Sequence, residues 1–582
     1  MALYKKTING KPYYYLRTIA RVDGKPKMVA ERYLGTAADL EKMLDASEVQ
    51  LLPERTPQLG FGDSAGVWEI LYRLDVAGII DSVVGARRSD AGASVGTYLV
   101  LAALNRVVQP TSKLGFADWW AGTALDRFSK VPASVLDHRR FWDAMHQVTL
   151  EQLAEIEERV ALAMIDRFGL DISALALDMT NFATYIDSGN QKAPIAQRGK
   201  AKQKRTDLRL IGLGLVVTRD GGVPLVAHAY PGNKPDVTQF PTMIDQLSAR
   251  HRQIADKAAK AAGSSTDSGT VGPDTVGPEV TVVFDAGQNS ASNFEYVTDT
   301  GLAFVGSIPP SHVTDLLALP ASRRRIVDKD RFGKLTATET RRIVYGAERR
   351  VILTHSPTLH DAQTAGFTQT LTKAQGKLAV LADTLARGKT RRTTTQVHAQ
   401  INKITRDSWL RRVLVCELTG STPTTHRLTV TVDEDARETL ETEVFGKRVL
   451  VTTHDTWPVA DIVAAYRSQS DAEFSFRQMK DPKVVSFSPM HHWTEHNIRV
   501  HTFTCVLALQ IVHLMRREAD HANLHLSVRE LLDQLAGIQE TVLIYPSTGG
   551  RPKARRMLTE TTNMQDQLAT IFNLARWAPK KS

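Results

Sequence analysis

The pattern of apolar and polar positions changes several times along the chain, and each change predicts a different kind of element. Residues 4–34 alternate aromatic and β-branched residues with polar ones around Asn-Gly-Lys and Asp-Gly-Lys turns, which predicts a small β-hairpin module. Residues 39–52 and 66–167 carry Leu, Ala and Val at three- and four-residue spacing, which predicts helices. From residue 175 onward, short apolar runs bounded by turns predict strands.

The strand-rich region has a definite order of elements. Three strands are expected at residues 174–186, 208–218 and 223–230, then a helix at 238–252, a strand at 280–285, a helix capped by Ser290 or Ser292, and a strand at 302–310. With one more helix, this is the order of the ribonuclease-H-like fold, a mixed sheet with helices on both faces. We therefore expect a mixed α/β fold with a ribonuclease-H-like core.

About 140 residues separate this core from its last helix. Several apolar runs within them read as strands, and an unstructured linker would not contain so many. We expect a β-rich insertion domain here. Its residues 387–412 carry eight basic residues and one acid, Asp407, so this segment is a candidate for gripping DNA. Residues 261–279, rich in Gly, Ser, Thr and Pro, predict a flexible surface loop.

Composition narrows the class of protein. The 582 residues are enough for three or more domains, and contents of 42% hydrophobic and 23% charged residues are those of a soluble globular protein. The net charge of +10 is compatible with nucleic-acid binding. The two cysteines exclude a disulfide framework and a cysteine-based zinc site. The amino terminus has no apolar signal region, and the apolar runs are too short to span a bilayer, so we expect no membrane association and a cytoplasmic, nucleoid-associated protein.

One stretch, residues 464–480, combines residue types with chemical potential. Tyr466, Glu473 and Lys480 are seven residues apart, so a continuous helix would project all three from one face, with Arg477 one turn beyond Glu473. Glu473 could then hold a metal ion while Lys480 binds a nearby phosphate. An ordinary solvated helix face is the alternative interpretation.

Two aspartates add to this set. Asp178 and Asp285 lie at or near the ends of strongly apolar strands, where an unpaired charge is costly to bury. The ribonuclease-H-like order places the Glu473 helix beside those strands, and three converging carboxylates repel one another unless a divalent cation lies between them. Mg²⁺ prefers such oxygen ligands, and two ions could activate a water or a 3′-hydroxyl for in-line displacement at phosphorus.

The chain resembles the DDE transposases of bacterial insertion sequences, in particular the insertion-sequence-four group. The resemblance rests on LDMTNF around Asp178, FDAGQNS around Asp285 and the pattern Y-x6-E-x6-K from Tyr466 to Lys480, in that order, together with the insertion. The group's pattern also has an Arg at the position of Gln469. The resemblance implies a catalytic and metal-binding triad of Asp178, Asp285 and Glu473, with Mg²⁺ as cofactor, two ions, and Mn²⁺ as a substitute.

The same resemblance implies partners and a reaction: cleavage at the ends of an insertion sequence, followed by attack of the 3′-hydroxyl ends on target DNA. Double-stranded DNA, as terminal inverted repeats and as target, is the expected partner, bound by a homodimer. Candidate DNA-binding residues are Tyr466, Arg477, Lys480, Lys200, Lys204, Arg205, Arg391 and Arg392. The expected divisions are a β-rich module at 1–60, a helical DNA-binding region at 61–170, the core at 171–310 and 451–545, the insertion at 311–450 and a basic tail at 546–582.

Three other functions remain open on the sequence. A metal-dependent nuclease on the same fold would cut DNA without joining it. A transposase-derived protein whose chemistry has decayed would bind DNA only, and Gln469 leaves room for that interpretation. A carbohydrate enzyme with paired carboxylates is the third, although the basic residues near the predicted site suit a polyanion better.

Overall fold

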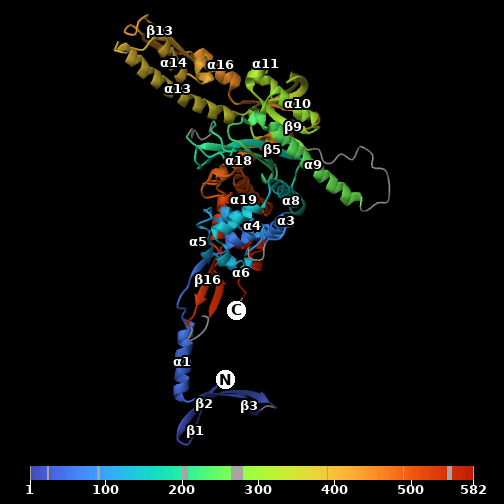
Figure 1. Cartoon of the computed structure of the whole chain (residues 1–582), viewed down its shortest axis with the longest axis vertical. Coiled ribbons are helices and arrows are strands. Elements are labelled where there is room, and N and C mark those ends of the chain that lie inside the picture. Colours follow the sequence, from blue (N-terminus) through green and yellow to red (C-terminus); the bar gives the residue numbers. More distant parts are fainter. Residues whose placement is uncertain are drawn as a thin grey trace. The chain divides into compact units, whose positions relative to one another are not determined.

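The computed structural model describes residues 2–22, 25–87, 92–199, 207–263, 280–389, 391–488, 490–546 and 553–580 (Figure 1). The chain divides into two compact units. The first, called here the terminal unit, comprises residues 1–77, 86–144 and 515–582, and the central unit comprises residues 78–85 and 145–514. Most of the predicted flexible loop, residues 264–279, lies outside the described residues. The finer division expected from the sequence stays a prediction.

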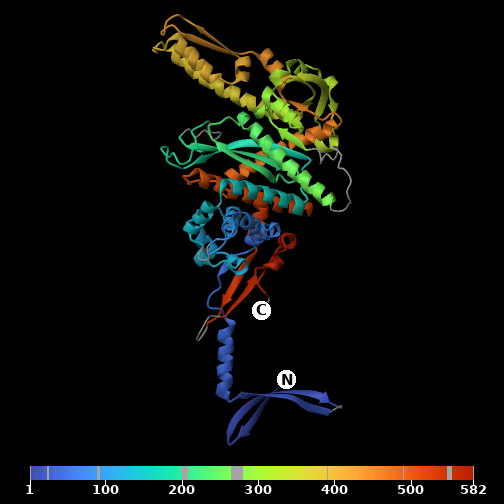
Figure 2. The same ribbon diagram turned by 45° about the vertical axis from the view of Figure 1, so that its right-hand side comes forward.

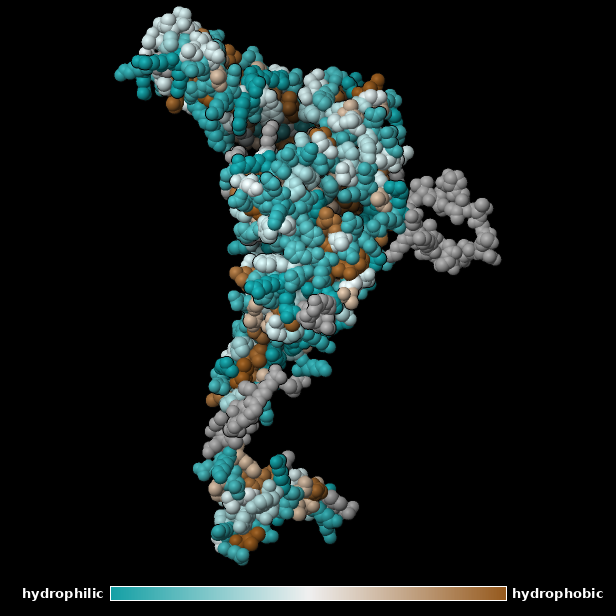
Figure 3. All heavy atoms as spheres, viewed as in Figure 1, coloured by the Kyte–Doolittle hydropathy of each residue, from teal (hydrophilic) through white to brown (hydrophobic). Residues whose placement is uncertain are grey.

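The terminal unit combines a small antiparallel sheet with a set of helices. Strands β1 (Ala2–Ile8), β2 (Lys11–Val22) and β3 (Lys25–Gly35) pair in chain order, with the predicted Asn-Gly turn between β1 and β2. The second predicted turn, at residues 23–24, lies outside the described residues. The helices are α1 (Ala37–Leu51), α2 (Gly62–Leu74), α4 (Val95–Val108), α5 (Phe116–Ala121), α6 (Leu125–Ser129), α20 (Val528–Ala536) and α21 (Asn563–Ile571). Helices α3 (Val76–Val84), α7 (His138–Gln147) and α19 (Glu495–His521) cross the unit boundary. The sheet β1–β3 exposes apolar side chains, among them Leu3 and Ile19. At the lower end of Figure 3, hydrophobic residues (brown) are visible among hydrophilic ones (teal).

The carboxyl-terminal segment, expected to be a basic tail or a short interaction helix, forms a strand and the short helix α21 among the described residues. Strand β17 (Ala554–Leu558) pairs with β16 (Gln539–Ile544), which also pairs with β4 (Gln58–Gly60). The backbone of the segment is therefore satisfied by a sheet. One arginine of the segment, Arg556, forms an ion pair with the buried carboxylate of Glu540, which also pairs with Arg127 of α6.

The central unit is built on a mixed sheet, which has nine strands among the described residues, in the order β10-β11-β12-β15-β9-β8-β5-β6-β7. Strands β5 (Ala174–Thr184), β6 (Arg209–Thr218) and β7 (Pro224–Pro231) are antiparallel neighbours, whereas β8 (Thr281–Phe284) and β9 (Ala303–Ile308) run parallel to β5. Helices α8 (Leu150–Phe168), α9 (Phe240–Gly263) and α10 (Ala291–Asp299) accompany them. The predicted order of strands and helices is present, and Ser290 caps α10.

Helices cover both faces of this sheet, as Figure 2 shows. One face carries Met179 of β5. A Cβ atom on its partner Gly214 would lie 2.7 Å from the Met243 sulfur of α9, so the Met243 side chain would have to shift to admit a larger residue there. The other face carries Asp178 and Thr180, and it is covered by α17 (Val459–Arg467) and α18 (Gln469–Lys480). Each face thus has its own layer of helices.

The insertion is not β-rich, contrary to the prediction. Strands β10 (Arg325–Ile326), β11 (Thr336–Val344), β12 (Ala347–His355) and β15 (Lys447–Thr452) extend the main sheet. The rest, called here the helical lobe, consists of α13 (Pro357–Ala386), α14 (Thr394–Ile404), α15 (Ser408–Val413) and α16 (Glu434–Val444) with the hairpin β13 (Leu414–Thr419) and β14 (Arg427–Val432). Short helices α11 (Thr314–Leu317) and α12 (Lys329–Phe332) precede it. Leucines of α13 and aromatic residues such as Phe445 form the core of the lobe.

Helix α19 is long and apolar enough to cross a membrane by length and composition. Of its most apolar stretch, 94% is buried inside the protein. That burial is typical of the core helix of a folded domain, and length and composition alone are weak evidence for a membrane span. The expectation that the apolar runs are too short to span a bilayer does not hold for α19 by length and composition, because the helix continues through polar residues that the fold buries, among them His501 and His513.

Candidate active site

Two aspartates lie side by side on neighbouring parallel strands. The register of β5 and β8 pairs Leu177 with Phe284. The next residues along the two strands are Asp178 and Asp285, so both carboxylates point to the same face of the sheet at the same level. Both residues are half-buried. Asp178 lies inside β5, not at its end as the sequence suggested, because the strand continues to Thr184.

Asp285 is held by two hydroxyl groups. The Ser307 Oγ donates a hydrogen bond to Asp285 Oδ1 at 2.8 Å, and the Tyr466 hydroxyl donates to the same oxygen at 3.1 Å. Arg448 Nη1 in turn donates to the Tyr466 hydroxyl at 3.3 Å. Burial, with the negative charge of Asp285 second, raises the pKa of Tyr466, so this residue stays a hydrogen-bond donor. The network fixes the orientation of the Asp285 carboxylate.

The stretch expected to be one helix is two. Helix α17 ends at Arg467, α18 begins at Gln469, and Ser468 lies between them. The Ser468 Oγ donates to the Ala465 carbonyl oxygen, and the backbone N–H of Asp471 donates to the Ser468 carbonyl oxygen, three residues back. These three-residue bonds interrupt the α-helical ladder. The prediction that Tyr466 shares one continuous helix face with Glu473 and Lys480 is therefore wrong, and Tyr466 reaches Asp285 from α17.

Helix α18 is attached to β5 at both of its ends. Gln469 Nε2 donates to the Leu177 carbonyl oxygen at 2.8 Å, next to Asp178. Lys480 Nζ donates to Thr180 Oγ1 at 2.7 Å and lies 5.4 Å from the centre of the Phe182 ring. Glu473 is four residues after Gln469 and seven before Lys480, so helical spacing places it on the same side of α18.

A cavity of about 420 Å³ opens beside these residues. It is lined in part by Asp285, Tyr466, Gln469, Glu473, Arg448 and Arg467. Glu473 is exposed to it, whereas Asp178 is not among its lining residues. The cavity therefore brings two of the three predicted carboxylates to one space, and the strand register brings Asp178 beside one of them.

The donor atoms around the aspartate pair suit a hard cation. The amide oxygens of Gln288, Asn289 and Gln469 are buried and have no hydrogen-bond partner; the first two residues follow Asp285 in the chain, and Gln469 is bonded to the residue before Asp178. Mg²⁺ takes one or two carboxylates and otherwise oxygen or water ligands. Among the described residues, no group of three or more His, Cys, Asp or Glu side chains is close enough to hold a metal ion together. The oxygen set fits Mg²⁺, with two carboxylates as its charged ligands.

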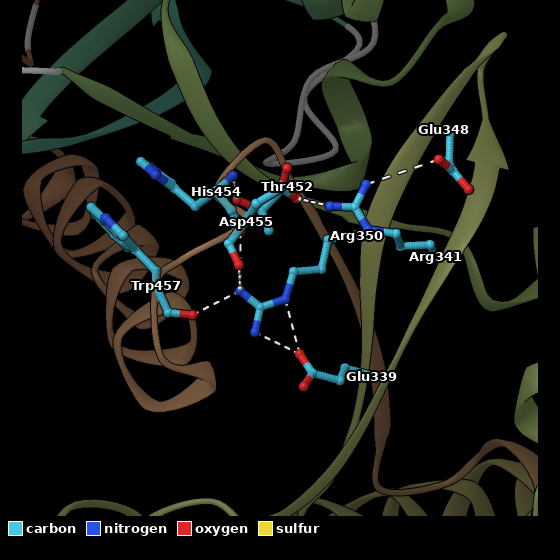
Figure 4. Close-up of polar contacts among 8 residues, drawn as sticks. All are labelled: Glu339, Arg341, Glu348, Arg350, Thr452, His454, Asp455 and Trp457. Carbon is cyan, nitrogen blue, oxygen red and sulfur yellow. Dashed lines mark hydrogen bonds and ion pairs between the residues drawn. The ribbon is translucent and has the colours of Figure 1, made fainter.

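An arginine on β12 anchors the segment that leads to α17 (Figure 4). Arg350 Nη1 donates to the carbonyl oxygens of His454, Asp455 and Trp457 at 3.1, 3.3 and 2.7 Å. Its Nε and Nη2 donate to Glu339. The His454 ring stacks on Trp457 with ring centres 3.7 Å apart. Residues 453–458 are thus tied to the sheet, and α17 begins directly after them.

The other predicted DNA-binding residues are scattered. Arg477 is exposed on α18, with its guanidinium 5.6 Å from the Phe474 ring centre. Arg391 is exposed and Arg392 half-buried just before α14, and neither lines the cavity. Lys200, Lys204 and Arg205 lie outside the described residues.

Sequence reasoning missed two residues of the site. Ser307 is a lone hydroxyl in the apolar strand β9, which was a usable signal for a polar role. Arg448 had no such signal, because its place depends on β15 pairing with β9.

Comparisons with known proteins give little more. No protein-family model matches the sequence, and no curated protein matches it. Among solved structures, the cryo-EM structure of a piggyBac transposase synaptic complex with hairpin DNA aligns with a TM-score of 0.35 and 9% sequence identity, over 83% of this chain and 82% of that one. Similarity at this level does not establish a common fold.

Proposed function

We propose that this protein is a DNA transposase of the DDE type, which cuts the ends of an insertion sequence and joins the 3′-hydroxyl ends to target DNA. The observation that carries the proposal is the register that sets Asp178 beside Asp285, with α18 attached to the same strand by Gln469 and Lys480. The strand order β7-β6-β5-β8-β9 and its directions support a ribonuclease-H-like core.

The residues of the site would have three roles: binding metal, orienting the Asp285 carboxylate and binding DNA phosphates. Asp178 and Asp285 would hold divalent metal, with Glu473 lining the adjoining cavity, and a bound Mg²⁺ would supply Lewis-acid activation of the attacking hydroxyl and stabilisation of the leaving oxygen. Tyr466 and Ser307 orient the Asp285 carboxylate through their hydroxyl hydrogens. Lys480 and the exposed Arg477 would bind DNA phosphates beside the carboxylates. Two copies of the chain would be needed to hold two DNA ends.

The reaction can be tested with the chain's own gene. DNA flanking the coding region should contain matched inverted repeats, and a labelled fragment carrying them would be incubated with the protein, a plasmid target and Mg²⁺. The proposal expects both cut ends and joined product. Asp285→Asn and Glu473→Gln should remove both products while DNA binding persists. Asp471→Asn, on the same helix but outside the cavity lining, is the matched control and should keep activity.

Three results would contradict the proposal, each in favour of a different function. Cut ends without joined product would identify a nuclease. Binding without any cleavage by the unaltered protein would identify a DNA-binding protein without this chemistry. Cleavage that survives Asp285→Asn would remove the carboxylate assignment itself.

A further inference from the structure

A groove in the helical lobe gathers positive charge away from the proposed active site. It lies between α13 and α14 and has a volume of about 890 Å³. Lys373 and Lys377 of α13 line one side, and Lys403 and Arg406 line the other. No acidic residue is among its lining residues. In Figure 1 these helices form the gold part of the chain at the upper left.

The four cations have no counter-charge of their own. Within the described part of the chain, none of these side chains takes part in an ion pair, although other arginines of the lobe do, as Arg412 does with Glu443. Four like charges around one hollow repel one another, and a bound polyanion would relieve that repulsion. Lys373 and Lys377 are one helical turn apart and therefore point to the same side of α13.

A glycine of α13 also lines the groove. Gly376 lies between the two lysines, and a Cβ atom there would meet nothing within 4 Å. A larger side chain at this position would therefore extend into the groove without displacing any neighbour. Val380, whose side chain is 66% exposed, gives the groove an apolar wall.

We propose that the α13–α14 groove binds the sugar-phosphate backbone of double-stranded DNA. Phosphates would pair with the four cations, and the sugars would lie against Val380. Arg391 is exposed in the connection between the two helices and extends the positive charge beyond the groove, which suits a long regular polyanion better than a short acidic peptide. The choice of DNA as the polyanion rests on the proposed function; the groove itself does not.

The test uses two kinds of variant, one that removes positive charge from the groove and one that fills the groove. Lys373→Gln/Lys377→Gln/Lys403→Gln removes charge, whereas Gly376→Trp fills the groove and leaves all four cations in place. Gly366→Trp is the matched control, because Gly366 lies on the same helix with nothing within 4 Å and does not line the groove. Circular dichroism would verify that each variant folds. Binding of a labelled duplex would be followed by fluorescence anisotropy in EDTA, between about 50 and 200 mM salt.

The triple variant should reduce the magnitude of the negative slope of log K against log salt by roughly 2 to 3, since each phosphate contact contributes about 0.9. Gly376→Trp should weaken binding about tenfold or more, whereas Gly366→Trp should leave it unchanged. An unchanged slope in the triple variant, or equal effects of the two tryptophans, would overturn the proposal. Polyglutamate would be tested in the same way. If the triple variant lost binding to polyglutamate but kept its binding to DNA, the groove would fit an acidic protein partner and the proposal would be overturned. Because EDTA prevents cleavage, these results do not depend on whether the proposed active site cuts DNA.

Discussion

Gln469 donates a hydrogen bond of 2.8 Å to the backbone carbonyl oxygen of Leu177, the residue that precedes Asp178. The bond ties the first turn of α18 to the strand that carries one of the two neighbouring aspartates. The same amide leaves its Oε1 buried and without a partner. In the transposase pattern that the sequence resembles, an arginine stands at this position. In this structure the Gln469 side chain holds the helix to the sheet.

Replacing Gln469 by Leu should therefore lower the stability of the protein, although the two side chains are similar in size. The Leu177 carbonyl oxygen would lose its donor from α18, at a cost of about 1–3 kcal/mol for a buried polar group. Thermal unfolding of Gln469→Leu should show a lower Tm than the parent protein. Gln478→Leu is a poor control because the Gln478 side chain is itself hydrogen-bonded to the buried His513. Ser470→Ala, on the exposed side of α18, serves instead and should change little. A Tm of Gln469→Leu equal to that of the parent would show that the bond does not hold the helix.

Tyr466→Phe isolates the hydroxyl that reaches Asp285. The phenyl ring keeps its packing and its position near the Arg448 guanidinium, which lies 5.7 Å from the ring centre. Only the bonds to Asp285 and from Arg448 are lost. If the hydroxyl orients the carboxylate, Mg²⁺-dependent cleavage should fall by about 10- to 100-fold, as for lost partners of metal ligands. Raising the Mg²⁺ concentration should recover part of the activity. An unchanged Mg²⁺ dependence would argue against this role.

The sequence predicts local elements well here and their pairing poorly. The runs around Asp178 and Asp285 are strands, as their apolar residues indicated, and Ser290 caps the following helix. That the two aspartates are adjacent depends on the register of strands about a hundred residues apart, which no local pattern encodes. For the same reason the strands of the insertion were assigned to a separate domain, although β12 and β15 extend the main sheet. The break at Ser468 arises from one side-chain bond to a carbonyl, which helical periodicity does not reveal.

Arg350 should matter for stability well beyond an ordinary surface arginine. Its side chain is only 12% exposed, and its separate nitrogens bond three carbonyl oxygens and the Glu339 carboxylate at the same time, which the single nitrogen of Lys cannot do. Arg350→Lys should lower the free energy of unfolding by about 2 kcal/mol, within the range for hydrogen bonds to charged groups. Arg341→Lys is the matched control: its ion pair with Asp455 joins side chains that are 51% and 57% exposed, so solvent screens the pair and the substitution should lower stability much less. Denaturant unfolding of the two variants side by side gives the comparison, and equal losses would contradict it.

Glu157, on α8, should make stability depend on pH. Burial raises its pKa to about 7, although the charges of Arg250 and Arg499 act in the opposite direction. The folded state therefore binds a proton that the unfolded chain, with an ordinary glutamate pKa, has already released. The contribution of Glu157 to the free energy of unfolding is therefore complete at pH values below its pKa in the unfolded chain, and it is lost as the pH rises towards 7. Glu157→Gln, which cannot ionise, should have a Tm close to that of the parent at pH 5 and a higher Tm at pH 8. Glu155→Gln changes an exposed residue of the same helix and should show no such difference. The opposite result is that the parent protein becomes more stable relative to Glu157→Gln when the pH rises from 5 to 8. That result would mean that Arg250 or Arg499 stabilises Glu157 as a carboxylate, and that Glu157 is not buried as a neutral acid.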